Sequence, residues 1–600
     1  MSYGKLEFNL FMGEEALPVD DAEIYVIDSK NPGFQEKKLK VDSNGKTTPI
    51  SLYTYEKILS EIPETEVQPY KTYDAVIISN TFQNKYIKDI PIFSGITSIQ
   101  NVQMTPKVRG GTGFDLIDIP PNGLLLDEYG EEVDDEEDLN NSNYIKPVPK
   151  VLGDVVIPEY ITVHLGTPSS YAQNVTVTFT DYIKNVASSE IYPTWPREAL
   201  KSNIYAQISF TLNRIYTEWY RSRGYDFDIT NSTAYDHYFV NGRNFYDTIV
   251  SVVDEIFNEY ISRKNFKEPL LAQYCNGTTV TCDGLSQWGT VDYANQGEDA
   301  LQILKEYYGN NIEIRSADYV AGPLTSYRGT PLRVGDSGED VKTIQMQLNR
   351  IRKNYPLIPE IKNENGVFNE ATKNAVKEFQ KIFGLTQDGI VGKQTWYKIS
   401  QIYVGVKKLA ELESEGENLD IPQSPPSEVL RLGSTGENVK ILQFLLNVVA
   451  AFYDTVEPVS ITGNFDNRTE DSVKSFQETF GLGVDGIVGK NTWAKLIEVY
   501  NILEPYLLTS TGELIKYPGY LIKKGKRGED VRLIQSWINE IHKKYPFIPE
   551  VSVDGIFGDK TREAIMIFQR WQGLVEDGIV GKITWDKLYE IYRQVVREGL

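Results

Sequence analysis

The chain has little cysteine and no long apolar run. Cys275 and Cys282 are its only cysteines, which excludes a disulfide framework and the usual four-ligand zinc spacing. A local disulfide and two buried thiols remain as interpretations. No stretch of about 18 apolar residues occurs, so we expect no membrane-spanning helix. The first residues show neither a basic region nor an apolar core, and we therefore expect no standard signal peptide.

The chain also lacks an excess of positive charge. Its formal net charge is -23 and its pI is about 4.8. Because nucleic-acid phosphates bind basic surfaces, we predict no nucleic-acid partner. The composition, 40% hydrophobic and 24% charged, is that of a soluble folded protein. At about 100 to 200 residues per domain, 600 residues predict several domains.

The C-terminal part of the sequence contains three copies of one pattern. The copies open with LRVGDSGEDVKTIQMQLN from Leu332, LRLGSTGENVKILQFLLN from Leu430 and IKKGKRGEDVRLIQSWIN from Ile522. Each continues through a Gly-x-Phe turn and a Phe-Gln pair, and each closes with DGIVG and a tryptophan. The recurring Phe-Gln pairs and tryptophans are Phe379-Gln380, Phe476-Gln477, Phe568-Gln569, Trp396, Trp493 and Trp585. Insertions between these marks are almost absent.

Each copy has the pattern of a small helical domain. Val341, Ile344 and Leu348 recur at helical spacing, so we expect one face of the first helix to be core. Asn369 and Asp559 are N-cap residue types that would begin the second helix. The simplest interpretation of the repeated phenylalanines and tryptophans is core packing.

These motifs resemble the three-helix peptidoglycan-binding module of bacterial wall hydrolases. The resemblance covers residues 330–410, 428–505 and 520–600, and it implies peptidoglycan glycan strands as the partner. It also implies that Asp388, Asp485 and Asp577, in the DGIVG turns, are polar contacts to the ligand. Three weak sites on one chain give avidity when they bind together. The polar, proline-containing stretch from Leu412 predicts a flexible spacer.

The N-terminal part predicts a β-domain followed by a linker. Residues 1–106 alternate apolar and polar positions, which favours a β-sandwich. The pattern resembles the carboxypeptidase-regulatory or transthyretin-like domain, which implies an accessory piece or pro-region. Residues 107–155 are rich in Gly and Pro and include the acidic run DEYGEEVDDEEDLNN, so we predict a linker there.

Residues 156–325 carry the candidate chemistry. The stretch DYIKNVASSEIYPTWPREALKSN and the later motif Ser286-Gln287-Trp288-Gly289, followed by Tyr307-Tyr308-Gly309, resemble the stage II sporulation protein D family. The resemblance implies an α+β enzyme that cleaves glycan strands as a lytic transglycosylase, with Ser286, Gln287 and Trp288 at the substrate.

We predict no cofactor and no bound metal. Some members of that family carry a His/Cys zinc site, whereas the corresponding stretch here, TNSTAYDHYFVNG, has no cysteine. His237 is therefore interpreted as a polar contact or core histidine, and Tyr235 and Asp236 are further candidates for substrate contact.

Two glutamates compete for the catalytic role. One carboxylic acid suffices, because it can protonate the leaving oxygen and then help the muramoyl 6-hydroxyl to close a 1,6-anhydro ring. Glu198 falls in the first turn of a helix announced by Thr194 and Pro196, where the helix dipole lowers a carboxyl pKa. Glu190 lies beside apolar residues that would raise its pKa, so we favour Glu190, with Glu198 or neither as alternatives.

The order of these parts resembles the spore cortex-lytic enzymes of the SleC type. This resemblance implies a multidomain α+β protein of the spore cortex or cell wall, activated by a protease that cuts within residues 107–158. Two alternatives remain open. One is a non-catalytic wall-binding or scaffold protein, and the other is a phage-type wall-degrading component.

Overall fold

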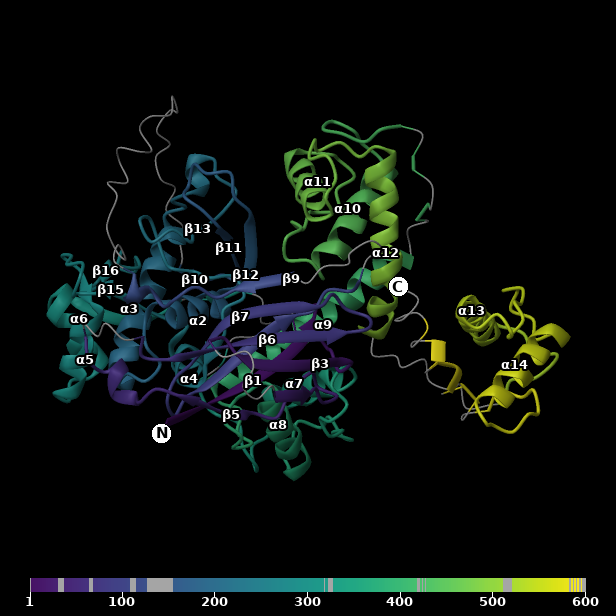
Figure 1. Cartoon of the computed structure of the whole chain (residues 1–600), viewed down its shortest axis with the longest axis horizontal. Coiled ribbons are helices and arrows are strands. Elements are labelled where there is room, and N and C mark those ends of the chain that lie inside the picture. The colour runs from purple at the N-terminus through teal and green to yellow at the C-terminus, as the bar shows by residue number, and fades with distance from the viewer. Residues whose placement is uncertain are drawn as a thin grey trace.

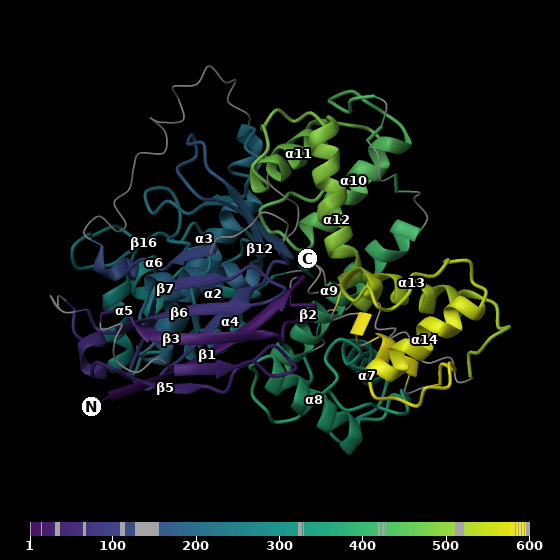
Figure 2. The ribbon, with the colours of Figure 1, turned by 45° about the vertical axis from the view of Figure 1, so that its right-hand side comes forward.

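A computed structural model describes residues 2–13, 15–30, 37–63, 68–107, 115–126, 155–317, 319–321, 327, 329–417, 421–422, 425–426, 428–510, 521–581, 584–585, 587–589, 591–592 and 595. Over these residues the protein is mixed α+β, with a β-rich N-terminal region and C-terminal helical repeats. Figures 1 and 2 show the purple N-terminal strands beside the blue-to-teal central region and beside the teal-to-green first repeat.

Two mixed sheets form the N-terminal region. Their strands and the accompanying 3-10 helices are β1 (Ser2–Met12), β2 (Leu17–Pro18), β3 (Ala22–Asp28), β4 (Lys37–Lys40), β5 (Ile50–Thr54), η1 (Lys57–Ser60), β6 (Lys71–Ser79), β7 (Lys85–Ile92), β8 (Thr97–Gln103), β9 (Asp115–Asp118) and η2 (Gly123–Leu125). One sheet has the order β8–β1–β2, with β5 also paired to β1, and the other has the order β4–β3–β6–β7–β9.

The alternation seen in the sequence builds this region. Successive side chains of a strand point to opposite faces, so alternate residues of β1 and β3 are buried. The buried residues of both sheets, such as Leu6 and Ile24, belong to one core. The predicted β-rich region is confirmed. Part of the segment predicted as linker is also sheet, because β9 pairs in parallel with β7. The acidic run lies outside the described residues.

The central region packs short strands around two buried helices. Its elements are β10 (Val156–Ile157), β11 (Tyr160–His164), β12 (Asn174–Thr178), α2 (Phe179–Glu190), α3 (Arg197–Tyr216), η3 (Arg221–Arg223), β13 (Ile229–Thr230), β14 (Phe245–Tyr246), α4 (Asp247–Ile256), β15 (Glu259–Arg263), β16 (Tyr274–Cys275), β17 (Leu285–Ser286), α5 (Gln287–Asn295), α6 (Ala300–Tyr308), β18 (Ile312–Ser316) and β19 (Tyr319–Val320). Helix α3 is buried along most of its length, which is typical of a helix at the centre of a domain.

The central region is joined to the N-terminal sheet by backbone pairing. Strand β14 pairs antiparallel with β8, with Phe245 opposite Ile99 and Tyr246 opposite Ser98. The hydrophobic core of the central region also includes Tyr70, Phe93 and Ile96 from the N-terminal region. The two regions therefore share a sheet and a core.

The three repeats form helical modules. Their helices are α7 (Glu339–Ile351), α8 (Glu370–Ile382) and α9 (Lys393–Glu417) in module 1, α10 (Glu437–Ala450), α11 (Asn467–Thr479) and α12 (Lys490–Ser510) in module 2, and α13 (Glu529–Lys544) and α14 (Asp559–Trp571) in module 3. Helix α9 extends through Glu417, into the stretch predicted as a spacer. The repeated phenylalanines and tryptophans are buried, which confirms their interpretation as core.

One predicted cap is correct and the other is wrong. Asn369 caps α8, since its side chain accepts a hydrogen bond from the Thr372 backbone N–H at 3.0 Å. Asp559 is instead the first residue of α14, whose N-cap is Gly558. Gly558 follows Phe557 as Asn369 follows Phe368, so the prediction was displaced by one residue.

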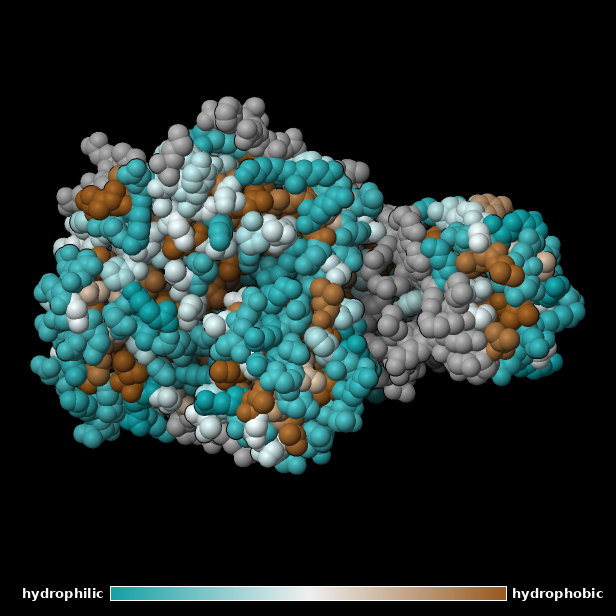
Figure 3. Space-filling model, turned by 90° about the horizontal axis from the view of Figure 1, so that it is seen from below, coloured by the Kyte–Doolittle hydropathy of each residue, from teal (hydrophilic) through white to brown (hydrophobic). Residues whose placement is uncertain are grey.

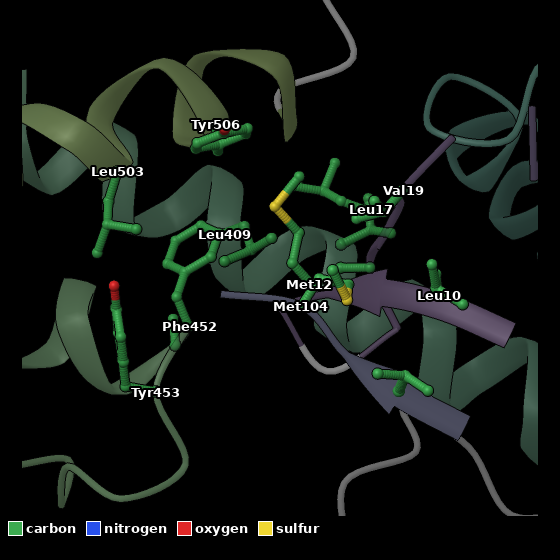
Figure 4. Packing of buried hydrophobic residues seen from close by; sticks show 14 of the residues in the cluster. Leu10, Met12, Leu17, Val19, Met104, Leu409, Phe452, Tyr453, Leu503 and Tyr506 are labelled. Atoms are coloured by element: carbon green, nitrogen blue, oxygen red, sulfur yellow. The ribbon is translucent and has the colours of Figure 1, made fainter. Parts of the chain in front are cut away.

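Modules 1 and 2 each contact the N-terminal region through a tyrosine at the equivalent position. The Tyr355 hydroxyl donates to the Glu15 carbonyl at 2.5 Å, and the equivalent Tyr453 hydroxyl donates to the Pro106 carbonyl at 3.3 Å. Figure 4 shows the apolar contact, with Leu409, Phe452 and Tyr506 beside Met12 and Met104. Module 3 has a hydrophobic core of its own and lies apart from this assembly in Figure 1.

None of the described helices is both long and apolar enough to cross a membrane. On the face seen in Figure 3, hydrophobic residues form separate patches among hydrophilic ones.

Candidate active site and wall-binding turns

Glu190 is held in the interior of the central region. It is the last residue of α2 and is 1% exposed. Its Oε2 accepts hydrogen bonds from the Gln207 Nε2 at 2.7 Å and from the Tyr274 hydroxyl at 2.6 Å. Its Oε1 accepts from the Tyr238 backbone N–H at 2.8 Å. Three donors from α3, β16 and the intervening loop therefore fix both carboxylate oxygens.

An aromatic cluster supports the turn that follows Glu190. Tyr192 and Trp195 lie between α2 and α3, and their rings pack edge to face at 5.9 Å. The Trp288 ring from α5 lies 4.9 Å from Trp195, centroid to centroid. These residues are the apolar neighbours that the sequence indicates, whereas the groups that touch the Glu190 carboxylate are polar.

The polar residues that contact the Glu190 carboxylate were not predicted. Gln207 lies in α3, and Tyr274 precedes Cys275, but neither belongs to the motifs that carried the prediction. Tyr274 is placed by its loop, which Cys275 and Cys282 close as a disulfide with Cα atoms 6.1 Å apart. Of the two interpretations of this cysteine pair, the structure supports the disulfide.

His237 lies next to this site as a buried core histidine, as predicted. Its Nδ1 is 3.0 Å from the Tyr182 hydroxyl, and its ring lies 5.7 Å from the Tyr274 ring. Burial, and secondarily the charge of Arg214, lower the pKa of His237 to about 3. The imidazole is therefore neutral at physiological pH.

Glu198 has a structural position. It lies in the first turn of α3, as predicted, and its Oε2 accepts a hydrogen bond from the Ala300 backbone N–H at 3.0 Å. Ala300 is the first residue of α6, so this carboxylate satisfies one of the free amides at that helix start. The structure does not bring Glu198 to the groups that hold Glu190.

The other predicted substrate residues serve the same local framework. Ser286 is the N-cap of α5, where its hydroxyl accepts from the Gly289 backbone N–H at 3.0 Å. Gln287 is fully buried, and its side-chain amide has no hydrogen-bond partner in the part of the chain that the structure describes. Trp288 is 8% exposed and belongs to the aromatic cluster. Ser286 is partly exposed, whereas contact of Gln287 or Trp288 with substrate needs a change in exposure.

Asp236 is committed to the fold. Its side chain is fully buried and accepts from Arg214 Nε at 2.9 Å, from the Tyr220 hydroxyl at 2.6 Å and from Thr230. These donors occupy both of its oxygens, so a contact with substrate would have to displace one of them. In the described part of the chain, no group of three or more His, Cys, Asp or Glu side chains is arranged to hold a metal.

The N-terminal region closes over Glu190. Asn122, at the start of η2, is 2% exposed and donates from Nδ2 to the carbonyls of Ser188 and Ile191, both at 3.4 Å. These two carbonyls flank Glu190 in the sequence. In addition, the Trp195 Nε1 donates to the Ser60 carbonyl at 3.0 Å. This arrangement keeps solvent and large molecules away from the carboxylate.

A buried glutamine braces the DGIVG turn in each module. Gln380 Nε2 donates to Asp388 Oδ1 at 2.9 Å, and Gln380 Oε1 accepts from the Gly389 backbone N–H at 2.8 Å. Gln477 with Asp485 and Gln569 with Asp577 repeat this arrangement. The three aspartates are exposed. Hydrogen bonds from the Ile487 backbone N–H and, to a lesser extent, from the Gln477 side chain lower the pKa of Asp485.

A second glutamine, not singled out in the sequence, braces the Gly-x-Phe turn. Gln345 in α7 donates to the Val367 carbonyl at 2.9 Å and accepts from the Gly366 backbone N–H at 2.9 Å. Gln443 and Gln535 do the same in the other modules. This glutamine recurs at the same position in all three opening motifs, and that recurrence could have indicated its structural role.

Comparison with known proteins identifies the modules. Residues 337–399, 435–496 and 527–588 each match the family described as "Putative peptidoglycan binding domain". The chain therefore carries three domains of this family, which supports peptidoglycan as the partner and an association with the cell wall.

Similar proteins include two wall amidases. The N-acetylmuramoyl-L-alanine amidase CwlL of Bacillus licheniformis is 32% identical over 27% of this chain and 45% of its own length. The N-acetylmuramoyl-L-alanine amidase CwlM of Mycobacterium tuberculosis is 30% identical over 29% of this chain and 40% of its own. The chain thus spans less than half of each. The crystal structure of the SleB N-terminal domain matches 13% of this chain and 97% of that chain, at 34% identity and a TM-score of 0.11.

Proposed function

We propose that this protein binds peptidoglycan through its modules and cleaves glycan strands of the spore cortex as a lytic transglycosylase, with Glu190 as the acid and base. The observation that carries the proposal is the arrangement at Glu190, a single buried carboxylate whose two oxygens are held by Gln207, Tyr274 and Tyr238. Gln207 and Tyr274 fix Oε2, as the positioning of a general acid requires, and the Tyr238 N–H has to release Oε1 before that oxygen can carry a proton to a substrate.

The proposed reaction needs one carboxylic acid and no water. Protonated Glu190 donates its proton to the glycosidic oxygen as the bond to muramic acid C1 breaks. The resulting carboxylate then takes the proton of the muramoyl 6-hydroxyl, whose oxygen bonds to C1 and closes the 1,6-anhydro ring. The proton count is restored, and no second carboxylate acts as nucleophile.

The substrate class is supported by the modules and by the relatives. Three domains match a family described as peptidoglycan binding, and two relatives are named N-acetylmuramoyl-L-alanine amidases. Those relatives would cut an amide bond, whereas our proposal concerns a glycosidic bond. The products therefore separate the two reactions.

The test is a product analysis on purified cortex peptidoglycan. The chain, intact and cut within residues 107–158, is incubated with it, together with the Glu190→Gln variant and the Glu198→Gln control cut in the same way, and soluble fragments are identified by mass spectrometry. We expect anhydro-muropeptides, reduced about a hundredfold or more by Glu190→Gln and little changed by Glu198→Gln. Released stem peptides would indicate an amidase, and hydrated reducing ends a hydrolase; either product would refute the transglycosylase.

A second candidate function is wall binding without catalysis. It is favoured by the 1% exposure of Glu190, which the Asn122 segment shields from any polymer. For the enzyme, the same observation requires that this segment move, as a protease cut between residues 107 and 158 would permit. A chain cut at an engineered site there that binds cortex and still releases no fragment would establish the second candidate.

A further inference from the structure

The segment over Glu190 presents two carbonyl oxygens to the central region. Arg243 Nη2 donates to the Pro120 carbonyl at 2.5 Å and, at 3.4 Å, to that of Pro121. The Tyr238 hydroxyl also donates to the Pro121 carbonyl, at 3.3 Å. Tyr238 is the residue whose backbone N–H holds Glu190 Oε1. The Arg243 guanidinium and the Tyr238 hydroxyl therefore both donate to the carbonyls of Pro120 and Pro121.

The same segment presents an amide donor two residues later. Asn122 Nδ2 donates to the carbonyls of Ser188 and Ile191, at 3.4 Å each. These carbonyls lie on either side of Glu190 in the sequence. The segment thus offers a carbonyl acceptor on one side and an amide N–H donor on the other.

Arg243 shows that an acceptor is needed at this place. The side chain is 2% exposed, and its Nε and Nη1 have no hydrogen-bond partner among the described residues. Arg214, also buried, pairs with the Asp236 carboxylate at 2.9 Å. Within the described residues Arg243 forms no such ion pair. A buried guanidinium without a carboxylate is costly, so the oxygens that reach it contribute strongly to what binds there.

We propose that Pro120–Asn122 occupies a subsite for the acetamido group of an N-acetylated sugar. Arg243 and Tyr238 would bind its carbonyl oxygen, and the carbonyls of Ser188 and Ile191 would accept its amide N–H. This proposal rests on the proposed function, because the ligand is the glycan strand that Glu190 cuts. A de-N-acetylated sugar lacks the carbonyl and carries an ammonium group, which the Arg243 charge repels.

Binding measurements test the subsite without turnover. The full chain carries Glu190→Gln to stop cleavage and Asn122→Ala to weaken the covering segment. Calorimetry compares an N-acetylglucosamine tetramer with its fully de-N-acetylated form. We expect the acetylated tetramer to bind at least about tenfold more tightly, and we expect Arg243→Lys or Tyr238→Phe to remove about that factor.

Arg315→Lys is the matched control, since Arg315 is a half-exposed residue of β18 whose guanidinium contacts Glu313 and the Phe266 carbonyl instead. Because Tyr238→Phe keeps the ring and the backbone N–H, it remains interpretable if Arg243→Lys fails to fold. Ligand contact with the three modules is common to all variants, so it cancels when the ratio of the two tetramer affinities is compared between variants. Equal affinity for the two tetramers, or no effect of either substitution, overturns the subsite.

Hydrogen exchange supplies a second readout on the unmodified chain. If the tetramer competes with the segment, adding it raises amide exchange in residues 119–126, and the de-N-acetylated tetramer does not. If the protein releases fragments from cortex but binds both tetramers equally, the subsite is rejected and the proposed enzymatic activity stands. If the protein binds the acetylated tetramer more tightly through Arg243 but releases no fragments, the subsite stands and the proposed enzymatic activity is rejected.

Discussion

His237 shows what burial does to a single side chain. Its environment lowers the pKa from 6.5 to about 3, because charging it would leave an imidazolium in the core. Below pH 6.5 the unfolded chain takes up a proton that the folded chain does not. Stability therefore falls by about 1.4 kcal/mol for each pH unit between these two values.

Histidine NMR tests this prediction directly, because the chain has three histidines. In a sample labelled on the imidazole rings, we expect the His237 signal to stay that of a neutral ring from about pH 7.5 to about pH 5. The signal is assigned by its loss in His237→Gln. A midpoint near 6.5 for that signal would show that the ring is solvated.

Residue identity was easier to foresee than residue contact. The motif around Glu190 singled it out because its neighbours in sequence are apolar. Gln207 and Tyr274, which touch its carboxylate, come from other parts of the chain. Nothing in one sequence marks a polar side chain as the partner of another that far away, so the polar contacts of the site could not be predicted.

At the scale of elements, the buried glutamines hold the turns of the modules. Gln569 binds the Gly578 N–H at 2.9 Å and the Ile579 carbonyl at 3.0 Å. Gln569→Leu would leave these buried backbone groups unpaired, and we expect a loss of about 2 kcal/mol or more in the stability of module 3. Amide exchange at Gly578 and Ile579 measures it.

Gln572→Leu in the same module is the control for that substitution. Gln572 is the C-cap residue of α14 and is only partly buried, so its replacement should cost far less. Equal protection loss in both variants would mean that the brace adds nothing to the turn.

Helices were the best predicted elements, and their ends were the worst. Apolar spacing places α7 correctly, since Val341, Ile344 and Leu348 are all buried. The cap at Asp559 failed because a one-residue shift changes which side chain precedes the helix without changing its apolar face. Periodicity fixes the face of a helix, whereas its first residue depends on the backbone of the preceding turn.

At the scale of the whole molecule, the three modules are used differently. Phe452 of module 2 is fully buried against the N-terminal region, and its carbonyl accepts from Gln103 Nε2 at 3.1 Å. The equivalent residue of module 3 is Lys544, which is exposed. This difference in sequence agrees with the separate core of module 3. It could not be used to predict which module docks, because the docking surface was not known from the sequence.

Placing a lysine at the docking position should release module 2. Phe452→Lys would bury a charge at the contact, which costs several kcal/mol, so we expect the module to separate from the N-terminal region. Small-angle scattering would show a larger radius of gyration. Leu357→Lys, at an exposed site of module 1, should leave the radius unchanged. An unaltered radius in a folded Phe452→Lys chain would contradict the assigned contact.

The pairing of β8 with β14 bears on what cutting the chain would do. A break within residues 107–158 severs one covalent link, yet the shared sheet, the shared core and the docked modules still join the two pieces. The clipped protein would behave as a complex of two polypeptides. Its onset of activity would then follow the dissociation rate of the N-terminal piece, a first-order delay that more protease cannot shorten, and recapture of the piece would depend on dilution.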